Sequence, residues 1–143
     1  MRRLAVFASG SGTNFEAIVS ACEQGVTGGE VVFMVCDKPG ARVVERAAAH
    51  GVETFVFAPK EYASKADYER EIVRLLDAAG VELVCLAGYM RILSDVVLEA
   101  YRDRIVNIHP SLLPAFKGAH AIADAFAYGV KVFGVTIHYV NGE

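Results

Sequence analysis

The amino-acid sequence predicts an α/β fold, built as an open, mostly parallel β-sheet with helices on both faces. Three observations predict this fold class. Short apolar runs alternate with helical stretches along the 143 residues, most runs are apolar on both faces, and glycine-rich or polar turns separate the elements. Strict alternation of this kind gives parallel strands joined by right-handed crossovers, and a chain of this length suits one compact domain over residues 1–143.

The expected strands are short runs dominated by apolar residues. The first is Leu4–Ala8 (LAVFA), and we expect the next four at Val31–Cys36, Thr54–Phe57, Leu83–Ala87 and Arg104–Ile108. Because parallel strands inside a sheet are covered on both faces, we interpret the second to fifth strands as central. A last, long strand is expected at Val130–Val140.

The expected helices follow the strands. They are Thr13–Gln24, Ala41–His50, Lys65–Ala79, Ser94–Tyr101 and Ala121–Tyr128, with an irregular stretch at His109–Gly118. Ser64 and Ser94 stand where helix N-caps are expected. The whole pattern is that of a Rossmann-like sheet, in which ligands bind outside the carboxyl ends of the strands. That rule nominates the loops that begin at Ser9, Asp37, Gly88 and His109.

Charge and cysteine content exclude several classes of protein. The formal net charge of -3 indicates no basic face for a nucleic-acid backbone. The 3 cysteines are odd in number and far apart, so we expect buried free thiols, with neither a disulfide framework nor a metal site. No run approaches the ~20 apolar residues of a membrane span, and the first apolar run is too short for a signal peptide. We therefore expect a cytoplasmic protein without nucleic-acid or membrane partners.

The segment Ser9–Asn14 (SGSGTN), here called the glycine loop, joins the first strand to the first helix. Its two glycines let the backbone approach a ligand closely, and the helix N-terminus offers unpaired N–H groups to an anion. The expected phosphate-binding residues are Gly12, Thr13 and Asn14. Dinucleotide binding is a rival, with Asp37 on a ribose, although Phe15 stands where that fingerprint has its third glycine. A plain tight turn is the other alternative.

Asn107 and His109 fall on one face of the fifth expected strand, at its carboxyl end. An amide can donate a hydrogen bond to a developing oxyanion and an imidazole can move a proton, so the pair suits acyl chemistry. A histidine that only caps a strand is the structural alternative. Pro110 and Pro114 stiffen the following loop and, with Asn107, favour the catalytic interpretation. The sequence identifies no comparable partner for His50.

Four strings of the sequence resemble one family. NIHPSLLPAFKG (Asn107–Gly118) is similar to the signature of formyltransferases that use 10-formyltetrahydrofolate. The glycine loop resembles the phosphate-binding loop of the branch that acts on glycinamide ribonucleotide. LAGYMRIL (Leu86–Leu93) and GVTIHYV (Gly134–Val140) resemble that branch's folate-pocket segment and its late strand. The strings follow the family's order and cover the chain from residue 1 to residue 140.

The resemblance implies the formyltransferase fold and an enzyme of purine biosynthesis, which formylates the amine of glycinamide ribonucleotide with 10-formyltetrahydrofolate as co-substrate. Asn107 and His109 would act on the tetrahedral intermediate, and the glycine loop would hold the phosphate. The implied folate-binding residues are Lys65, Met90, Arg91, Ile92, Leu93 and Asn107. The resemblance implies no metal and only small-molecule substrates as partners, and it leaves a homodimer open.

Two departures from the family pattern stand out. Lys117 occupies a place where relatives usually carry proline, and the aspartate that pairs with the family's catalytic histidine is expected just past Glu143. Residues 1–143 are therefore expected to lack the family's C-terminal portion.

Two other enzymes of the family are the alternatives within it. Methionyl-tRNA formyltransferase would need a basic surface for tRNA, and the net charge of -3 argues against that. Formyltetrahydrofolate hydrolase usually carries an additional N-terminal domain, whereas the first expected strand here begins at Leu4. Outside the family, a non-catalytic dinucleotide-binding module is the alternative.

Overall fold

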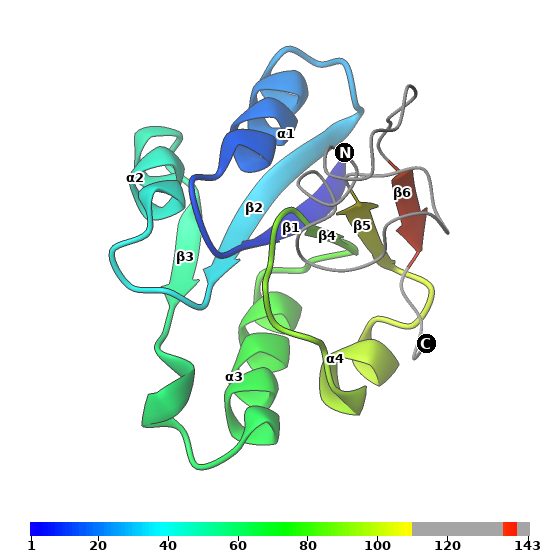
Figure 1. Ribbon diagram of the computed structural model, residues 1–143. Coiled ribbons are helices and arrows are strands. Elements are labelled where there is room, and N and C mark those ends of the chain that lie inside the picture. The colour runs from blue at the N-terminus through cyan, green and yellow to red at the C-terminus, as the bar shows by residue number, and fades with distance from the viewer. Residues whose placement is uncertain (110–135, 140–143) are drawn as a thin grey trace, which may run out of the picture.

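The computed structural model describes residues 1–109 and 136–139, and it confirms the α/β fold class. Within these residues, one sheet has the strand order β3-β2-β1-β4-β5-β6 (Figure 1). The strands are β1 (Arg2–Ala8), β2 (Gly29–Cys36), β3 (Glu53–Val56), β4 (Leu83–Leu86), β5 (Ile105–His109) and β6 (Thr136–Tyr139). Neighbouring strands are parallel except for β5 and β6, which are antiparallel. The expectation of a mostly parallel sheet is confirmed.

The position of β3 differs from the expectation. We predicted the second to fifth strands as central, but β3 lies at an edge of the sheet and β1 lies inside it. The residues of β3 are exposed or half-buried, and the buried Phe57 packs into the core just after the strand has ended. The apolar run Thr54–Phe57 therefore includes a residue, Phe57, that is buried after the strand has ended. Periodicity alone does not distinguish this arrangement from a strand in the middle of the sheet.

The chain reverses the direction of sheet growth between β1 and β4. From β1 it adds β2 and β3 on one side, and it then returns to add β4 and β5 on the other side. The loops that follow β1 and β4 therefore leave the same edge of the sheet side by side. In open α/β sheets, ligands bind at such a switch point, outside the carboxyl ends of the strands.

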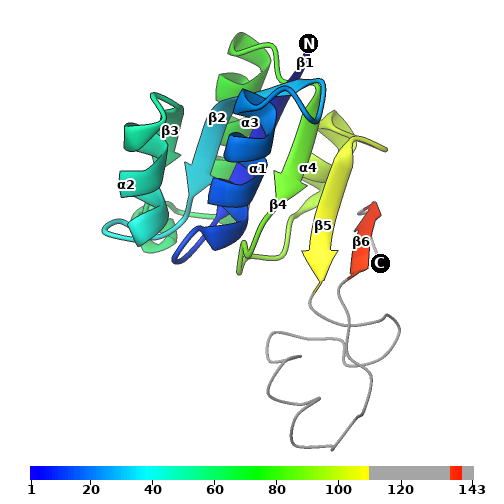
Figure 2. The same cartoon turned by 90° about the horizontal axis from the view of Figure 1, so that it is seen from above.

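Helices cover both faces of the sheet, as predicted (Figures 1 and 2). Helices α1 (Thr13–Glu23) and α2 (Arg42–Ala49) lie on one face, and α3 (Lys65–Ala78) and α4 (Asp95–Ala100) lie on the other. A short 3-10 turn, η1 (Pro59–Glu61), precedes α3. The helices thus frame the carboxyl edge of the sheet from both sides.

Two of the helices begin at the predicted N-caps. The hydroxyl of Ser64 accepts a hydrogen bond from the N–H of Asp67 at the start of α3. The hydroxyl of Ser94 accepts one from the N–H of Val96 at the start of α4. Each serine satisfies a backbone donor that has no partner within the helix, so both expectations are confirmed.

Alternate residues of the strands fill two cores, one on each face. The core under α1 and α2 includes Leu4, Val6, Phe15, Met34, Val43 and Ala47. The core under α3 and α4 includes Phe7, Val35, Ile72, Val84, Tyr101 and Ile105. The described cysteines, Cys22, Cys36 and Cys85, are buried and free, as predicted. Burial raises the pKa of Cys85 to about 11, as expected for a packing residue rather than a reactive thiol.

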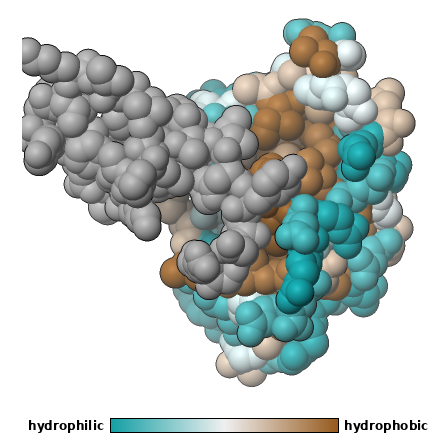
Figure 3. Space-filling view, turned by 90° about the vertical axis from the view of Figure 1, so that its right-hand side faces the viewer, coloured by the Kyte–Doolittle hydropathy of each residue, from teal (hydrophilic) through white to brown (hydrophobic). Residues whose placement is uncertain are grey.

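Several predicted features lie outside the described residues. They are the helix Ala121–Tyr128, the stretch from Pro110 to Gly118, and the strand Val130–Val140 except for β6. In the part of the chain that is described, no helix is long and apolar enough to cross a membrane. Figure 3 shows hydrophobic surface, bordered by hydrophilic side chains, on the face that forms the right-hand side of Figure 1.

Candidate active site

A cleft of about 370 Å³ opens at the switch point, where the loops after β1 and β4 meet. The glycine loop forms one wall, and the residues after β4 form the other. The lining residues are Ser9, Gly10, Ser11, Gly12, Thr13, Asn14, Lys38, Ala87, Gly88 and Met90. The cleft therefore joins three of the four loops that the sequence nominated, those beginning at Ser9, Asp37 and Gly88.

The predicted phosphate-binding residues stand at the start of α1. Gly12 is the N-cap residue, and its φ of 76° lies in the left-handed region that favours glycine. A Cβ on Gly12 would lie 2.5 Å from Cγ2 of Val43, so a side chain does not fit there. Thr13 and Asn14 are exposed in the first turn, where backbone N–H groups have no partner within the helix. This geometry suits an anion at the helix N-terminus.

Helix α2 holds the glycine loop from behind. The N–H of Val43 donates to the carbonyl oxygen of Gly10 at 3.0 Å, and Nε of Arg46 donates to the carbonyl oxygen of Ser11 at 2.7 Å. Because a trans peptide group is planar, its C=O and N–H bonds point in opposite directions. Anchoring these two carbonyls to α2 therefore directs the N–H groups that follow them away from α2.

A polar link ties the glycine loop to the segment Met90–Leu93, here called the β4 segment. The hydroxyl of Ser9 donates to Oδ1 of Asp37 at 2.5 Å and accepts from the N–H of Met90 at 2.9 Å. Nε of Arg91 donates to Oδ2 of Asp37 at 3.0 Å. Ser9 and Asp37 are buried. The Asp37 carboxylate is thus engaged on both oxygens, which argues against its holding a ribose in the dinucleotide alternative.

Lys65 and the β4 segment, which the resemblance assigns to folate, are in direct contact. Nζ of Lys65, at the start of α3, donates to the carbonyl oxygen of Ile92 at 2.7 Å. The side chains of Met90 and Ile92 are exposed, whereas Leu93 packs into the core under α3 and α4. Leu93 can therefore offer a ligand only its backbone, while Met90 and Ile92 present apolar side chains.

Strand β5 ends beside β4 at the same edge of the sheet. Asn107 is half-buried and pairs in register with Leu86 of β4, and it stands two residues after Ile105 in the core under α3 and α4. His109 is the last residue of β5, and its backbone is in register with Thr136 of β6. The structure thus places both predicted catalytic positions at the end of one strand. The proline-containing loop that follows lies outside the described residues.

One residue that lines the cleft, Lys38, was absent from the predicted set, and the neighbouring Tyr89 packs against the core. Lys38 lines the cleft and is exposed, and it follows Asp37 directly in one of the nominated loops. The ring of Tyr89 packs edge-on against Phe7 at a centroid distance of 5.3 Å. Its hydroxyl is buried without a hydrogen-bond partner among the described residues, and burial raises the pKa of Tyr89. The position of Lys38 next to a nominated loop residue was the only sequence signal for it.

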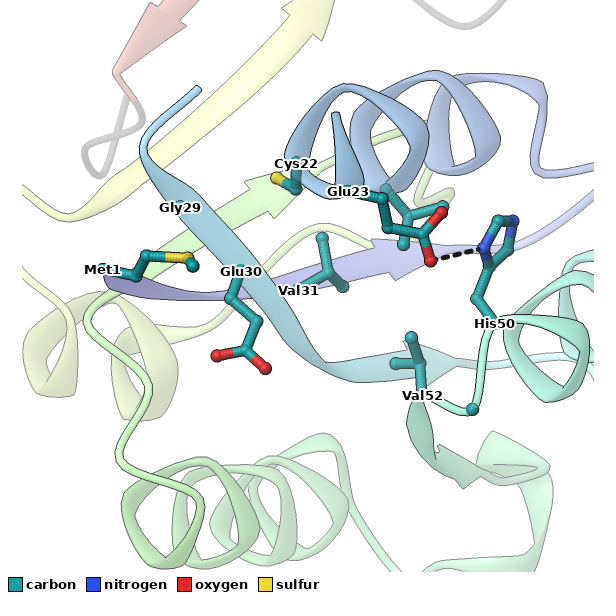
Figure 4. A pocket seen from close by; sticks show the side chains of 10 residues that line it. Met1, Cys22, Glu23, Gly29, Glu30, Val31, His50 and Val52 are labelled. Carbon is teal, nitrogen blue, oxygen red and sulfur yellow. Dashed lines mark hydrogen bonds and ion pairs between the residues drawn. The ribbon is translucent and has the colours of Figure 1, made fainter. Parts of the chain in front are cut away.

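His50, for which the sequence identified no partner, joins α1 to the end of α2. Its Nδ1 lies 3.0 Å from Oε2 of Glu23, and its Nε2 lies 2.6 Å from Oε2 of Glu16 (Figure 4 shows the contact with Glu23). These hydrogen bonds raise the pKa of His50 above its ordinary value. His50 and Glu23 line a second cavity of about 320 Å³ at the amino ends of β1 and β2, the end opposite the cleft. Within residues 1–109 and 136–139, no cluster of His, Cys, Asp or Glu side chains could hold a metal ion.

The chain belongs to the formyl transferase family, since the family model described as formyl transferase matches residues 2–143. Phosphoribosylglycinamide formyltransferase of Bacillus subtilis is 51% identical over 141 residues, which are 99% of this chain and 72% of that protein. The trifunctional purine biosynthetic protein adenosine-3 of Drosophila melanogaster is 41% identical over 98% of this chain and 10% of its own length.

Solved structures agree with these relatives. Glycinamide ribonucleotide transformylase 1 from Geobacillus kaustophilus superposes with a TM-score of 0.97 at 55% identity, covering 100% of this chain and 76% of that one. Phosphoribosylglycinamide formyltransferase from Bacillus halodurans gives a TM-score of 0.95 at 52% identity, covering 99% and 73%. The predicted formyltransferase fold, and the prediction of a formyltransferase of purine biosynthesis with small-molecule substrates, are confirmed.

Proposed function

We propose that this chain transfers the formyl group of 10-formyltetrahydrofolate to the amine of 5-phosphoribosylglycinamide, in de novo purine biosynthesis. One observation carries the proposal: the glycine loop, the β4 segment and the end of β5 all lie at the carboxyl edge of one sheet, around the switch point. The names of the relatives support the same acceptor substrate. We also propose that the protein acts in the cytoplasm, without nucleic-acid or membrane partners, and that it forms a homodimer.

The proposed reaction is a direct transfer. The glycinamide nitrogen attacks the formyl carbon, a new C–N bond forms, and the bond between that carbon and N10 of the folate then breaks. The proton that leaves the attacking amine ends on N10. In this scheme the Asn107 amide donates to the oxyanion of the tetrahedral intermediate, and His109 moves the proton. Holding both substrates in one cleft supplies much of the rate enhancement, and no covalent enzyme intermediate is formed.

The substrates are assigned to the two walls of the cleft. We propose that Gly12, Thr13 and Asn14 bind the ribonucleotide phosphate at the start of α1. The exposed first turn supports this assignment, as does the left-handed glycine that begins it. The proposed folate-binding residues are Lys65, Met90, Arg91, Ile92, Leu93 and Asn107. Exposed apolar side chains on the β4 segment suit a flat pterin ring, and its backbone can supply hydrogen bonds.

We also propose that residues 1–143 form a single catalytic domain, whose histidine is completed by an aspartate located after Glu143. Such a carboxylate would orient the imidazole and raise its basicity. The test compares formyl transfer by residues 1–143 with that of the same chain extended by the C-terminal portion of the Bacillus subtilis relative. We expect the extended chain to be faster by up to about ten-thousand-fold. Equal rates would refute a role for that carboxylate.

The catalytic assignment is tested by Asn107→Ala and His109→Ala in the extended chain. Each change should lower kcat by about a hundred- to a thousand-fold and leave the KM for the ribonucleotide nearly unchanged. Thr13→Ala is the matched comparison and should mainly raise that KM. The double variant should lose less than the product of the two single effects, because both residues act on one intermediate. A near-normal kcat in His109→Ala, with only KM changed, would show that the histidine binds substrate and does not take part in catalysis.

A further inference from the structure

The formyl-transfer scheme gives no role to Asp37, although its carboxylate is buried beside the cleft. Its side chain is 5% exposed, and each carboxylate oxygen accepts one side-chain hydrogen bond. One donor is the Ser9 hydroxyl, and the other is Nε of Arg91. A buried carboxylate is costly unless its oxygens are paired, so Asp37 strongly favours the conformation in which both donors stay in place.

Leu93 anchors one end of the β4 segment in the core under α3 and α4, whereas its Met90–Arg91 end relies on polar contacts for its position next to the cleft. Met90 and Ile92 are 65% and 82% exposed, so neither of them anchors the segment in the core. The N–H of Met90 is held by the Ser9 hydroxyl, and the next residue, Arg91, is held by Asp37. Since Ser9 is itself bound to Asp37, this one carboxylate acts on two consecutive residues of the segment.

We propose that Asp37 is a positioning residue for the folate half of the site. It holds the backbone of Met90 and Arg91 at the cleft wall, in the conformation that binds the pterin. Asp37 would act through Ser9 and Arg91 and would not touch either substrate. This inference rests on the proposed function, because it takes the β4 segment to be the folate-binding wall.

Ser9, at the start of the glycine loop, is bound to Asp37, but the part of the loop that leads into α1 is anchored by other contacts, so the proposal predicts a selective effect. Two of its carbonyl groups, those of Gly10 and Ser11, bind Val43 and Arg46 of α2. Neither contact involves Asp37. Loss of the Asp37 charge should therefore displace the β4 segment while the phosphate-binding wall keeps its geometry.

The test is Asp37→Asn, with both Michaelis constants measured separately. The asparagine oxygen can still accept from Ser9, but its amide group then faces the Arg91 guanidinium, donor against donor. The KM for 10-formyltetrahydrofolate should rise about tenfold to a hundredfold, the range for loss of one charge-assisted hydrogen bond. The KM for 5-phosphoribosylglycinamide should change less than about threefold. Asp67→Asn is the control, because it removes an equivalent contact to Arg70 on the exposed face of α3 and should leave both constants unchanged.

Arg91→Ala provides a second variant, since its guanidinium is half-exposed and its loss leaves the cores intact. It should raise the same KM, and the effects of Asp37→Asn and Arg91→Ala should be clearly less than additive because they share one contact. Additive effects, or equal rises of both Michaelis constants, would overturn the proposal. The proposal would also be overturned if the parent chain transfers formyl groups and the Asp37→Asn protein folds but has an unchanged KM for the folate. A parent chain that neither binds the folate nor transfers its formyl group would overturn the proposed function as well.

Discussion

Gly12→Ala should be the most damaging small substitution in the glycine loop. Gly12 has a φ of 76°, and a left-handed conformation costs a residue with a Cβ about 1–2 kcal/mol. The new Cβ would also lie 2.5 Å from Cγ2 and 2.7 Å from Cβ of Val43, and 3.0 Å from its backbone Cα. Overpacking against a buried side chain costs about 1–3 kcal/mol more. We therefore expect the free energy of unfolding to fall by about 2–5 kcal/mol.

Two other glycines separate the contributions to this loss. Gly25 has the same φ of 76°, but no atom lies within 4 Å of the position that a Cβ would occupy. Gly25→Ala should therefore cost only the conformational part, about 1–2 kcal/mol. Gly10 has neither a positive φ nor a close neighbour, so Gly10→Ala should leave stability unchanged or raise it by up to about 1 kcal/mol.

Urea titrations followed by far-UV circular dichroism measure all three variants, since the chain has no tryptophan to report by fluorescence. The expected order of stability is Gly10→Ala, then Gly25→Ala, then Gly12→Ala. A Gly12→Ala protein as stable as Gly25→Ala would refute the reasoning, because it would mean that the loop relaxes away from Val43 at no cost.

Two further predictions concern α2. Arg46→Ala should raise the KM for 5-phosphoribosylglycinamide about fivefold to tenfold with little change in kcat, because the Ser11 carbonyl loses its donor. Arg74→Ala, which removes the contact with Glu71 on α3, is the control. Equal values of this KM in the two variants would contradict the prediction. The pKa of His50 is raised by Glu23 and Glu16, so its contribution to stability is complete below its unfolded pKa of about 6.5 and is lost as the pH rises through the higher folded value. Urea titrations of the parent chain and His50→Gln should therefore give a difference in the free energy of unfolding that shrinks as the pH rises. A difference that stays constant with pH would show that protonation of His50 does not contribute to stability.

Local sequence was sufficient to locate the elements and most of their ends. From β1 to β5 the predicted and observed ranges agree within two residues, because apolar periodicity and caps such as Ser64 act over short distances. The glycine loop was also recognisable, since its glycines, helix start and preceding strand are consecutive. A lone histidine at a strand end has several ordinary explanations, but Asn107 beside His109 and the prolines that follow favoured a catalytic interpretation, and the family resemblance then implied the role of each residue.

The sequence by itself determined the order of strands and helices along the chain, the loops that border the cleft, and the family. Only the tertiary structure decided that β3 lies at an edge, that Asp37 binds Ser9 and Arg91, and that His50 bridges two glutamates. These features depend on which distant segments meet: Asp37 and Arg91 are 54 positions apart, and His50 and Glu16 are 34 apart. Periodicity reports how each segment is buried, but hydrogen bonds between segments depend on how the strands are ordered in the sheet and on which helix ends that order brings together.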